Sequence, residues 1–354
     1  MLEPLITRLK CEELAARLAN FAQESIVRVR CGTQLWEGTN REWLATPHGH
    51  LRTSAFRTAS VTKTFTSALT FRLMEQGKLS PSDTIDQHLP TEYLRSLPQS
   101  AAATSSGGGI TLRQLLDHSS GLYDYATDAD FRFAVMRTPS RRWSAKDLLE
   151  AAQSGRPYFP PGSGVAYSDT GYVLLGLIIQ GVAEMPLSSA YRLLVAEPLG
   201  LTDTYLEGAD SGSGLPIAHA FQGNIDTFDF DPTFDAFGGG GLISTASELD
   251  RFISSLMSGS FFCNSTTLDS MLRGKAMPDG IGTRKTYVAC GISEFEVGGT
   301  RLWGHLGHWN SFMLYNPSLD LSLCGTFNQS TSSPAQIEFL ECAVRTAREW
   351  TANK

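Results

Sequence analysis

The 354-residue chain lacks the features that mark several common functional classes. It has no run of lysine or arginine and carries a formal net charge of −7, which argues against a nucleic-acid binder, because such proteins draw their affinity from a basic surface. No apolar stretch approaches the length of a membrane-spanning helix. The six cysteines are widely spread and form no CxxC pair, so they are expected to be buried thiols.

Residues 1–25 also lack the pattern of a secretory signal. Leu9, Leu14, Leu18 and Phe21 recur at helical spacing among charged residues, which predicts an amphipathic helix. A signal peptide would need an uninterrupted apolar stretch behind a basic end. We therefore expect a soluble, cytoplasmic protein with no membrane partner.

The predicted elements place strands near both ends of the chain and helices between them. Residues 24–58 alternate in the manner of antiparallel strands. Residues 110–205 contain helical patterns, and strands return from residue 236. The stretch SAAATSSGGG, residues 100–109, is typical of a flexible surface loop. A composition of 42% hydrophobic and 18% charged residues allows a sizeable core.

This order of elements predicts an α/β fold of the α+β type, with an antiparallel sheet flanked by helices and formed by both ends of the chain. One α/β lobe would comprise residues 1–85 and 236–354. A mainly helical lobe, residues 86–235, would be inserted into it. We expect the active site between the two lobes.

The stretch RTASVTKTFTSAL, residues 57–69, places Ser60 three positions before Lys63 at the start of an expected helix. Side chains at i and i+3 are neighbours on a helix, so the lysine could activate the serine if burial lowered the pKa of its ammonium. The helix N-terminus would also favour a developing oxyanion at Ser60. Alternatively, Ser60 caps the helix and Lys63 is solvated, because SxxK also occurs by chance.

Two later motifs favour the catalytic interpretation. Tyr167-Ser168-Asp169 follows FPPGSGVA, and His305-Leu306-Gly307 lies in the strand-like stretch RLWGHLGHWNSF. In this order the three motifs resemble those of the serine β-lactamase-like and penicillin-binding-protein-like hydrolases, which include class C β-lactamases, DD-peptidases, D-amino-acid amidases and esterases. The resemblance extends over residues 56–329 and also includes LRQLLDHSSGL and FGGGGLISTASELDRF.

The resemblance implies a role for each residue that matches the first two motifs. Ser60 resembles the serine that is acylated in this family. Lys63 resembles the lysine that holds or takes the serine proton. Tyr167 resembles the tyrosine that passes a proton to the leaving group, either as tyrosinate or through its hydroxyl.

The third motif implies a binding role. His305 stands where the family often has lysine, and the HxG variant is familiar in the peptidase and amidase branches. Gly307 would let substrate approach the strand closely. The backbone N–H groups of His308 and Ser60 would form the oxyanion hole. We expect no cofactor and no metal, because His305 and His308 would point to opposite faces of a strand.

Asp169 departs from the family pattern, since the third position of the family's YxN motif is asparagine. A carboxylate only accepts hydrogen bonds, so an Asp169 that faces the site would suit a cationic or hydroxylated substrate. Alternatively, Asp169 caps the helix that follows it. Both interpretations stay open on the sequence alone.

Three other segments have two interpretations each. Asp117-His118 could be a catalytic pair, but adjacent residues do not face each other on a helix, so a packed turn is favoured. The glycines from Gly238 to Gly241 predict a tight turn into a strand beside the site and not a phosphate loop. Residues 221–237, FQGNIDTFDFDPTFDAF, form either an exposed acidic loop or a substrate-binding wall that favours amines.

We therefore expect a covalent serine acyl hydrolase that cleaves amide or peptide bonds of small amine-bearing substrates, D-amino-acid derivatives among them. One alternative is a carboxylesterase or acyltransferase on the same scaffold, and a second is a non-catalytic binding homologue. The binding partner would be a small amide, peptide or ester and not a nucleic acid. The sequence leaves the oligomeric state open.

Overall fold

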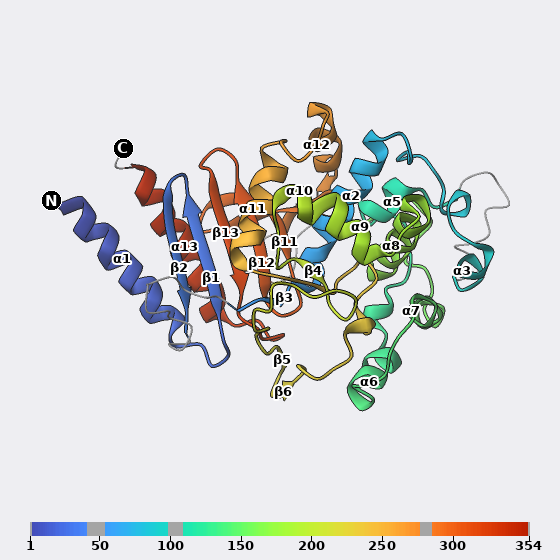
Figure 1. The fold of residues 1–354 in the computed structure, drawn as a ribbon, viewed down its shortest axis with the longest axis horizontal. Helices are drawn as coiled ribbons and strands as arrows, with labels where there is room; N and C mark the ends of the chain where they lie inside the picture. Colours follow the sequence, from blue (N-terminus) through green and yellow to red (C-terminus); the bar gives the residue numbers. More distant parts are fainter. Residues whose placement is uncertain (1, 41–53, 98–108, 277–284, 353–354) are drawn as a thin grey trace.

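The computed structural model describes residues 2–40, 54–97, 109–276 and 285–352. The main sheet lies toward one end of the molecule and a group of helices lies at the other (Figure 1). This arrangement confirms the expected fold class, an antiparallel sheet flanked by helices. Of the loop predicted at residues 100–109, all but Gly109 lies outside the described residues.

Within the described residues, the largest sheet has eight strands in the order β2-β1-β13-β12-β11-β10-β9-β8, and each neighbouring pair is antiparallel. β1 pairs with β13, so strands from the two ends of the chain lie side by side. The sheet therefore forms only when both ends of the chain come together. Its strands are β1 (Ile26–Cys31), β2 (Gln34–Thr39), β8 (Lys275–Ala276), β9 (Lys285–Val288), β10 (Ser293–Val297), β11 (Thr300–Leu306), β12 (Ser311–Asn316) and β13 (Leu321–Thr326).

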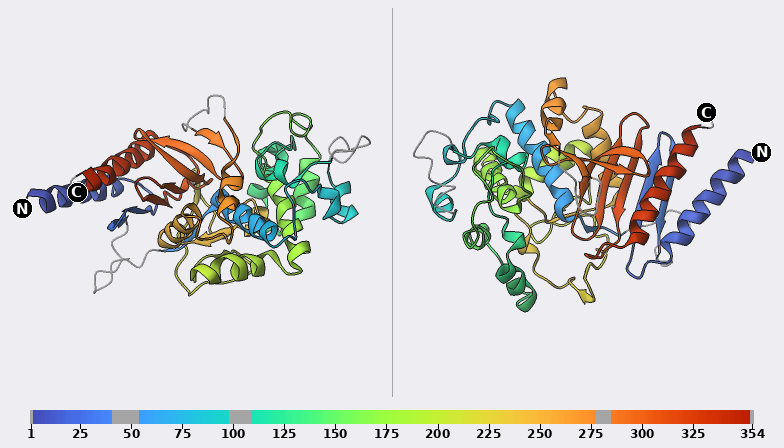
Figure 2. Two further views of the ribbon diagram at one scale, coloured as in Figure 1. Left: turned by 90° about the horizontal axis from the view of Figure 1, so that it is seen from above. Right: turned by 180° about the vertical axis from the view of Figure 1, so that it is seen from behind.

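One face of this sheet is covered by α1 (Leu2–Leu18) and α13 (Pro334–Ala352), which lie next to each other (Figure 2). The predicted amphipathic helix near the N-terminus is thereby confirmed. Val27 and Val29 of β1 share an apolar cluster with Leu14 of α1. Successive strand side chains point to opposite faces, so these valines bury one face of β1 against the two helices.

The opposite face of the sheet is covered by α11 (Ala246–Met257). Arg28 and Arg30, which alternate with the valines of β1, form ion pairs there with Asp250 of α11. Thr245 is the N-cap of this helix, because its hydroxyl accepts a hydrogen bond from the backbone N–H of the residue three positions later.

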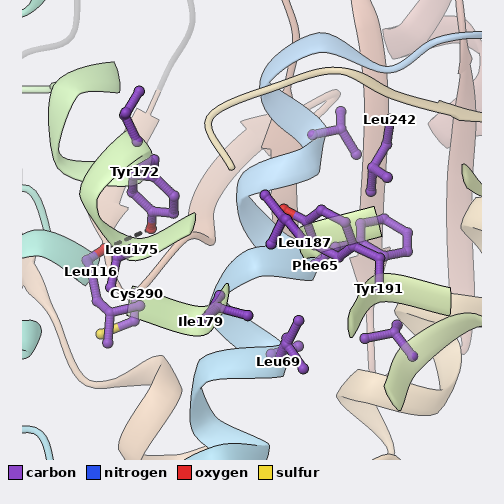
Figure 3. Packing of buried hydrophobic residues seen from close by; sticks show 14 of the residues in the cluster. Phe65, Leu69, Leu116, Tyr172, Leu175, Ile179, Leu187, Tyr191, Leu242 and Cys290 are labelled. Atoms are coloured by element: carbon purple, nitrogen blue, oxygen red, sulfur yellow. Dashed lines mark hydrogen bonds between the residues drawn. The ribbon is translucent and has the colours of Figure 1, made fainter. Parts of the chain in front are cut away.

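The central helix α2 (Thr62–Glu75) begins directly after a short 3₁₀ turn, Ala59–Val61. The chain leaves this helix at Gly77, two positions after its last residue, where a φ of +69° is the left-handed conformation common after a helix C-terminus. Its side chains are buried among residues of other helices, as Figure 3 shows for Phe65. The ring of Phe65 stacks on Phe252 of α11 with centroids 3.7 Å apart.

The predicted helices of the middle region are present. They lie between the main sheet and the far end of the molecule (Figure 1). The predicted lobe boundaries at residues 85 and 236 stay a prediction. The helices here are α3 (Thr91–Arg95), α5 (Leu112–Leu116), α6 (Ala129–Arg137), α7 (Ala145–Ala152), α8 (Asp169–Ala183), α9 (Leu187–Tyr191) and α10 (Glu197–Leu199), and α12 (Ser265–Leu272) follows α11.

Two small sheets connect the middle region to α2. β3 (Phe56–Arg57) and β4 (Tyr205–Leu206) pair with opposite edges of β7 (Leu242–Ser244). β5 (Phe221–Gln222) and β6 (Ile225–Asp226) form a hairpin. The first of these sheets fixes the chain immediately before α2.

Two expectations drawn from composition can be compared with the structure. Among the described helices, none alone has the length and apolar composition to cross a bilayer, although α8 and the segment Leu187–Leu199, at 79° to each other, meet that criterion as a bent pair. Four cysteines are buried, whereas Cys263 is exposed. The prediction of buried thiols is therefore wrong for Cys263.

The stacked pair of Phe65 and Phe252 predicts a large loss of stability on truncation. Phe252→Ala should lower the free energy of unfolding by about 3–5 kcal/mol, because it removes a buried ring and leaves a cavity. Phe133, which is 63% exposed, is the matched control, and Phe133→Ala should cost less than about 0.5 kcal/mol. Urea unfolding of both variants would measure this. Equal losses would contradict the packing described.

Candidate active site

Ser60 lies in the 3₁₀ turn before α2 and lines a cavity. Its neighbour Ala59 has a φ of +47°, a costly conformation for a residue with a side chain. Hydrogen bonds of Thr58 hold the turn. Its backbone N–H donates to the Leu242 carbonyl, and its carbonyl accepts from the Ser311 hydroxyl. The N-cap of the turn is Thr58 and the N-cap of α2 is Val61, and neither makes a side-chain capping hydrogen bond. The alternative in which Ser60 caps the helix is therefore wrong.

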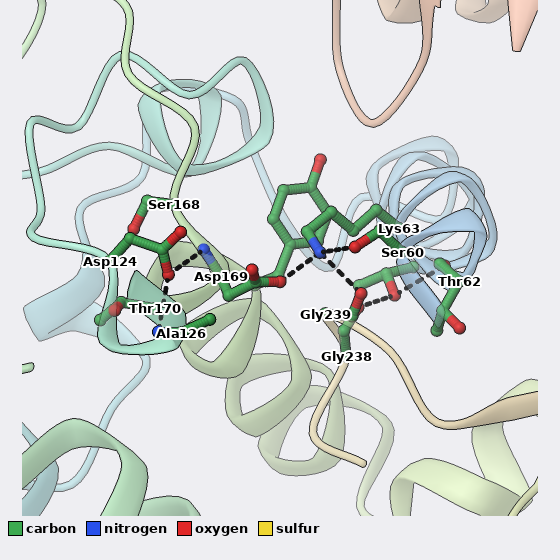
Figure 4. A network of polar contacts seen from close by, with 12 residues as sticks. Ser60, Thr62, Lys63, Asp124, Ala126, Ser168, Asp169, Thr170, Gly238 and Gly239 are labelled. Atoms are coloured by element: carbon green, nitrogen blue, oxygen red, sulfur yellow. Dashed lines mark hydrogen bonds and ion pairs between the residues drawn. The ribbon is translucent and has the colours of Figure 1, made fainter. Parts of the chain in front are cut away.

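Lys63 is fully buried and contacts Ser60. Its Nζ lies 3.1 Å from Ser60 Oγ and donates to the Gly239 carbonyl at 2.7 Å, and it forms an ion pair with Asp169 (Figure 4). Burial lowers the pKa of this ammonium, but the attraction of nearby acidic groups, Asp169 foremost, outweighs it and raises the pKa above its ordinary value. The condition under which Lys63 would be a neutral base, a pKa lowered by burial, is therefore not met, and the sequence did not show that Asp169 would be its partner.

Tyr167 lies beside the same ammonium. Lys63 Nζ is 4.9 Å from the centroid of its ring, within the range of a cation–π contact. Burial raises the pKa of the Tyr167 hydroxyl, and its interactions with Lys63 and Ser60 only partly oppose this. Tyr167 is therefore a neutral phenol at pH 7, next to both Ser60 and Lys63.

His118 packs against Tyr167, a contact that the sequence analysis did not predict. Its ring stacks on Tyr167 with centroids 4.4 Å apart, and its Nδ1 accepts a hydrogen bond from the Ser168 N–H. His118 is buried, with a φ of +58°. The interpretation of residues 117–118 as a packed turn agrees with this position, but the two rings are 49 residues apart in the chain, so no local pattern predicts their contact.

Asp169 is the first residue of α8, and the N-cap of that helix is Ser168. The predicted capping role of Asp169 is therefore wrong. The Asp169 carboxylate instead forms an ion pair with Lys63. The backbone N–H of Asp169 donates to the Asp124 carboxylate at 3.1 Å. Asp169 also lines the cavity, so a contact with substrate stays a prediction.

Two further carboxyl groups share this region with Asp169: Asp235, which belongs to the acidic segment 221–237, and Asp124, which the sequence analysis did not single out. Asp124 accepts hydrogen bonds from the N–H groups of Ala126 and Asp169. Asp235 also lines the cavity. Burial, followed by repulsion from Asp169, raises the pKa of both Asp124 and Asp235 to about 7. Together with Asp169, they place three carboxyl groups in the lining of the cavity, which also includes the Arg132 guanidinium.

The end of β11 brings the third motif to the Ser60 turn. His305 is buried, and its Nδ1–H donates to the Leu306 carbonyl at 2.7 Å. A Cβ atom on Gly307 would collide with the Thr58 carbonyl and the Ser311 hydroxyl. Glycine is thus required here for packing against the nucleophile turn, and its predicted role in substrate approach stays a prediction.

His308 lines the cavity, and its Nε2–H donates to Gln222 at 2.7 Å. Burial, aided by the charge of Arg132, lowers the pKa of His308, so its ring is neutral at pH 7. Among the described residues, no group of three or more histidine, cysteine, aspartate or glutamate side chains has the arrangement of a metal site. The oxyanion-hole role of the Ser60 and His308 N–H groups stays a prediction.

The cavity has a volume of about 600 Å³. Residues 221–237 contribute part of its wall, in agreement with the second interpretation of that segment. The predicted turn of glycines is also confirmed, because it precedes β7 and supplies the carbonyl that Lys63 binds. Besides Ser60, Tyr167 and the carboxyl groups, the lining is mainly apolar and includes Phe131, Val135, Met136, Phe230, Phe234, Leu306 and Trp309.

Comparisons with known proteins agree with this fold and site. A protein-family model described as Beta-lactamase matches residues 35–340. This is most of the chain, so the chain belongs to the beta-lactamase family. The expected family is thereby confirmed.

Individual relatives are more distant. The chain is 27% identical over 219 residues to the D-alanyl-D-alanine-carboxypeptidase/endopeptidase AmpH of Escherichia coli, a match that covers 62% of this chain and 53% of that protein. The chain thus spans about half the length of AmpH, and a match to penicillin-binding protein 4* of Bacillus subtilis, 32% identical over 151 residues, covers 30% of that protein.

Solved structures share the fold over nearly the whole chain. A D-stereospecific amidohydrolase from Streptomyces superposes with a TM-score of 0.77 at 24% identity, covering 93% of this chain and 96% of that one. A D-amino acid amidase from Ochrobactrum anthropi, complexed with L-phenylalanine amide, superposes with a TM-score of 0.80 at 21% identity, covering 98% and 99%.

The Lys63–Asp169 pair predicts that Asp169→Asn destabilises the protein although it restores the family's asparagine. The change leaves a buried ammonium without its closest counter-charge, which should cost about 3 kcal/mol of unfolding free energy at pH 7. The control is Glu150→Gln, which removes an exposed carboxylate 3.7 Å from Lys146 and should cost less than about 0.5 kcal/mol. If Asp169→Asn were as stable as the control, the ion pair would not be needed to balance Lys63.

Proposed function

We propose that the protein is a covalent serine acyl hydrolase that cleaves amide or peptide bonds of small amine-bearing substrates. The observation that carries this proposal is the 3.1 Å approach of Lys63 Nζ to Ser60 Oγ within a cavity of about 600 Å³. If Ser60 had no catalytic role, nothing would favour the burial of Lys63 beside it, because a buried charge costs stability. This also argues against the alternative of a non-catalytic binding homologue.

In the proposed reaction, Ser60 Oγ attacks the carbonyl carbon and forms the acyl-enzyme. The oxyanion of the tetrahedral intermediate would be stabilised by the N–H groups of Ser60 and His308. Water then attacks the acyl carbon and releases the acid, so Ser60 regains its proton. Each step breaks one bond at the acyl carbon and forms another, and the proposed reaction needs no cofactor.

The protonation states favour Tyr167 as the proton relay. Lys63 is an ammonium, so it holds the serine oxygen and cannot accept the serine proton at rest. The Tyr167 hydroxyl is neutral. It can take the Ser60 proton while it donates its own proton to the leaving nitrogen, and the adjacent ammonium would stabilise negative charge that develops on it.

The charge balance of the cavity supports substrates with a free amine. Asp124, Asp169 and Asp235 line the cavity with one cationic side chain, Arg132, while the buried Lys63 pairs with Asp169. A substrate ammonium would supply a further positive charge and stabilise the ionised carboxylates. The likeness to amidases that act on D-amino acids supports the same substrate class, including the D configuration.

Ester hydrolysis or acyl transfer is the second candidate. The mainly apolar lining favours it, since phenylalanine, valine and methionine side chains suit an uncharged acyl chain better than a polar peptide. Both candidates use the same acyl-enzyme on Ser60, and they differ in the leaving group and in the need for an amine.

Intact-protein mass spectrometry tests the shared mechanism and ranks the two candidates. The protein is mixed briefly with a nitrophenyl ester, a D-amino-acid amide or a penicillin. We expect the ester and the amide to be consumed, with a mass gain of one acyl group in wild type and none in Ser60→Ala. Consumption of the ester alone would favour the second candidate. A mass gain that persists in Ser60→Ala would contradict the proposal.

The raised pKa values predict pH-dependent binding of amines. Asp124 and Asp235 are neutral well below pH 7 and negatively charged above it. An alkylamine keeps its proton over this range, so its binding should strengthen as pH rises. As a competitive inhibitor of ester hydrolysis, benzylamine should bind about tenfold more tightly at about pH 8 than at about pH 5.5.

Benzyl alcohol, which has the same shape without the charge, is the control and should bind equally at both pH values. In Asp235→Asn the pH dependence of benzylamine binding should shrink, because of the two carboxyl groups with a raised pKa only Asp124 remains. Benzylamine inhibition that does not change with pH would remove the electrostatic support for an amine-bearing substrate.

A further inference from the structure

Arg57 connects the chain that carries Ser60 to the cavity wall. It lies in β3, three positions before Ser60, and is nine-tenths buried. Its Nη1 donates to the Thr227 carbonyl at 2.7 Å, and its Nη2 donates to the Phe228 carbonyl at 3.0 Å. One guanidinium thus holds two successive carbonyls of the segment 221–237.

Glu207, beside β4, fixes Arg57 in this position. Its two carboxylate oxygens accept hydrogen bonds of 2.8 Å from Nε and Nη2 of Arg57. The planar guanidinium matches a carboxylate in this two-point geometry, which a lysine ammonium does not reproduce. Arg57 therefore has little freedom to move away from the two carbonyls.

Side chains of the same segment line the cavity. Thr227, Phe230 and Phe234 line it, whereas Arg57 and Glu207 are not among the lining residues. The same segment is held at its other edge by Gln222, which accepts from His308. The cavity wall is thus tied to the turn that carries the nucleophile and to the candidate oxyanion-hole residue.

We propose that Arg57 is a positioning residue that, with Glu207, fixes the wall at Thr227 to Phe234 against the Ser60 turn and so determines the use of bulky acyl groups. This inference rests on the proposed function, because it concerns the acyl group delivered to Ser60. A loosened wall would weaken binding of a large acyl group, whereas a small one would not reach the wall.

The test compares two esters in Arg57→Lys: 4-nitrophenyl acetate, which is small, and 4-nitrophenyl phenylacetate, which carries a ring. KM for the phenylacetate should rise about tenfold, while kcat/KM for the acetate stays within about twofold of wild type. Glu207→Gln keeps the shape of the partner but removes its charge. It should likewise lower kcat/KM for the phenylacetate relative to kcat/KM for the acetate.

Arg30→Lys is the matched control. Arg30 also binds a buried carboxylate, Asp250, but it lies on the main sheet away from the cavity. Its variant should lose comparable stability and should leave the ratio of kcat/KM for the two esters unchanged. Hydrogen exchange of the amides at residues 227–235 should become faster in Arg57→Lys and not in Arg30→Lys, which tests the wall without any activity.

Three results would overturn the inference. An equal loss of kcat/KM for both esters in Arg57→Lys would mean that Arg57 has only a general structural role. An unchanged exchange rate at residues 227–235 would mean that Arg57 does not hold the wall. If wild type hydrolyses neither ester and gains no acyl group, the proposed function fails, and this inference fails with it.

Discussion

The buried ammonium of Lys63 is the interaction on which the site depends. An unpaired charge in a protein core costs several kcal/mol, so this lysine is stable only where acceptors reach it from several directions. Its acceptors are the Ser60 hydroxyl, the Gly239 carbonyl and the Asp169 carboxylate. They come from the turn before α2, the glycine turn before β7 and the start of α8. The fold must therefore bring these three segments together before Lys63 can be buried.

The surrounding structure holds the nucleophile turn in a conformation that it would not adopt alone. The positive φ of Ala59 is maintained by hydrogen bonds to Thr58 and by close packing of Gly307, where a side chain would collide with the turn. Strain of this kind persists only where neighbours impose it. The β3–β7 pairing on one side and the end of β11 on the other supply these neighbours, so the two sheets jointly position Ser60.

Much of the fold could be predicted because it follows local patterns. The alternation in β1 and β2, the apolar spacing of α1 and the glycine after α2 are readable in short windows of sequence. The three motifs also identified Ser60, Lys63 and Tyr167, which the structure brings together. The charge state of Lys63 could not be predicted, because it depends on Asp169, 106 residues away. His118 and Asp124 were missed for the same reason, since their contacts with Tyr167 and Asp169 exist only in the folded chain.

The central claim, that Lys63 is an ammonium balanced by carboxylates in the free protein, can be measured directly. Lysine labelled with ¹³C at Cε reports its protonation through its chemical shift, and Lys63→Arg identifies the signal. The account predicts that this signal does not titrate below about pH 10, because Asp169 stabilises the charged form. A titration near about pH 7 would mean that burial dominates. Lys63 would then be a neutral base at rest, which would contradict the relay assigned to Tyr167.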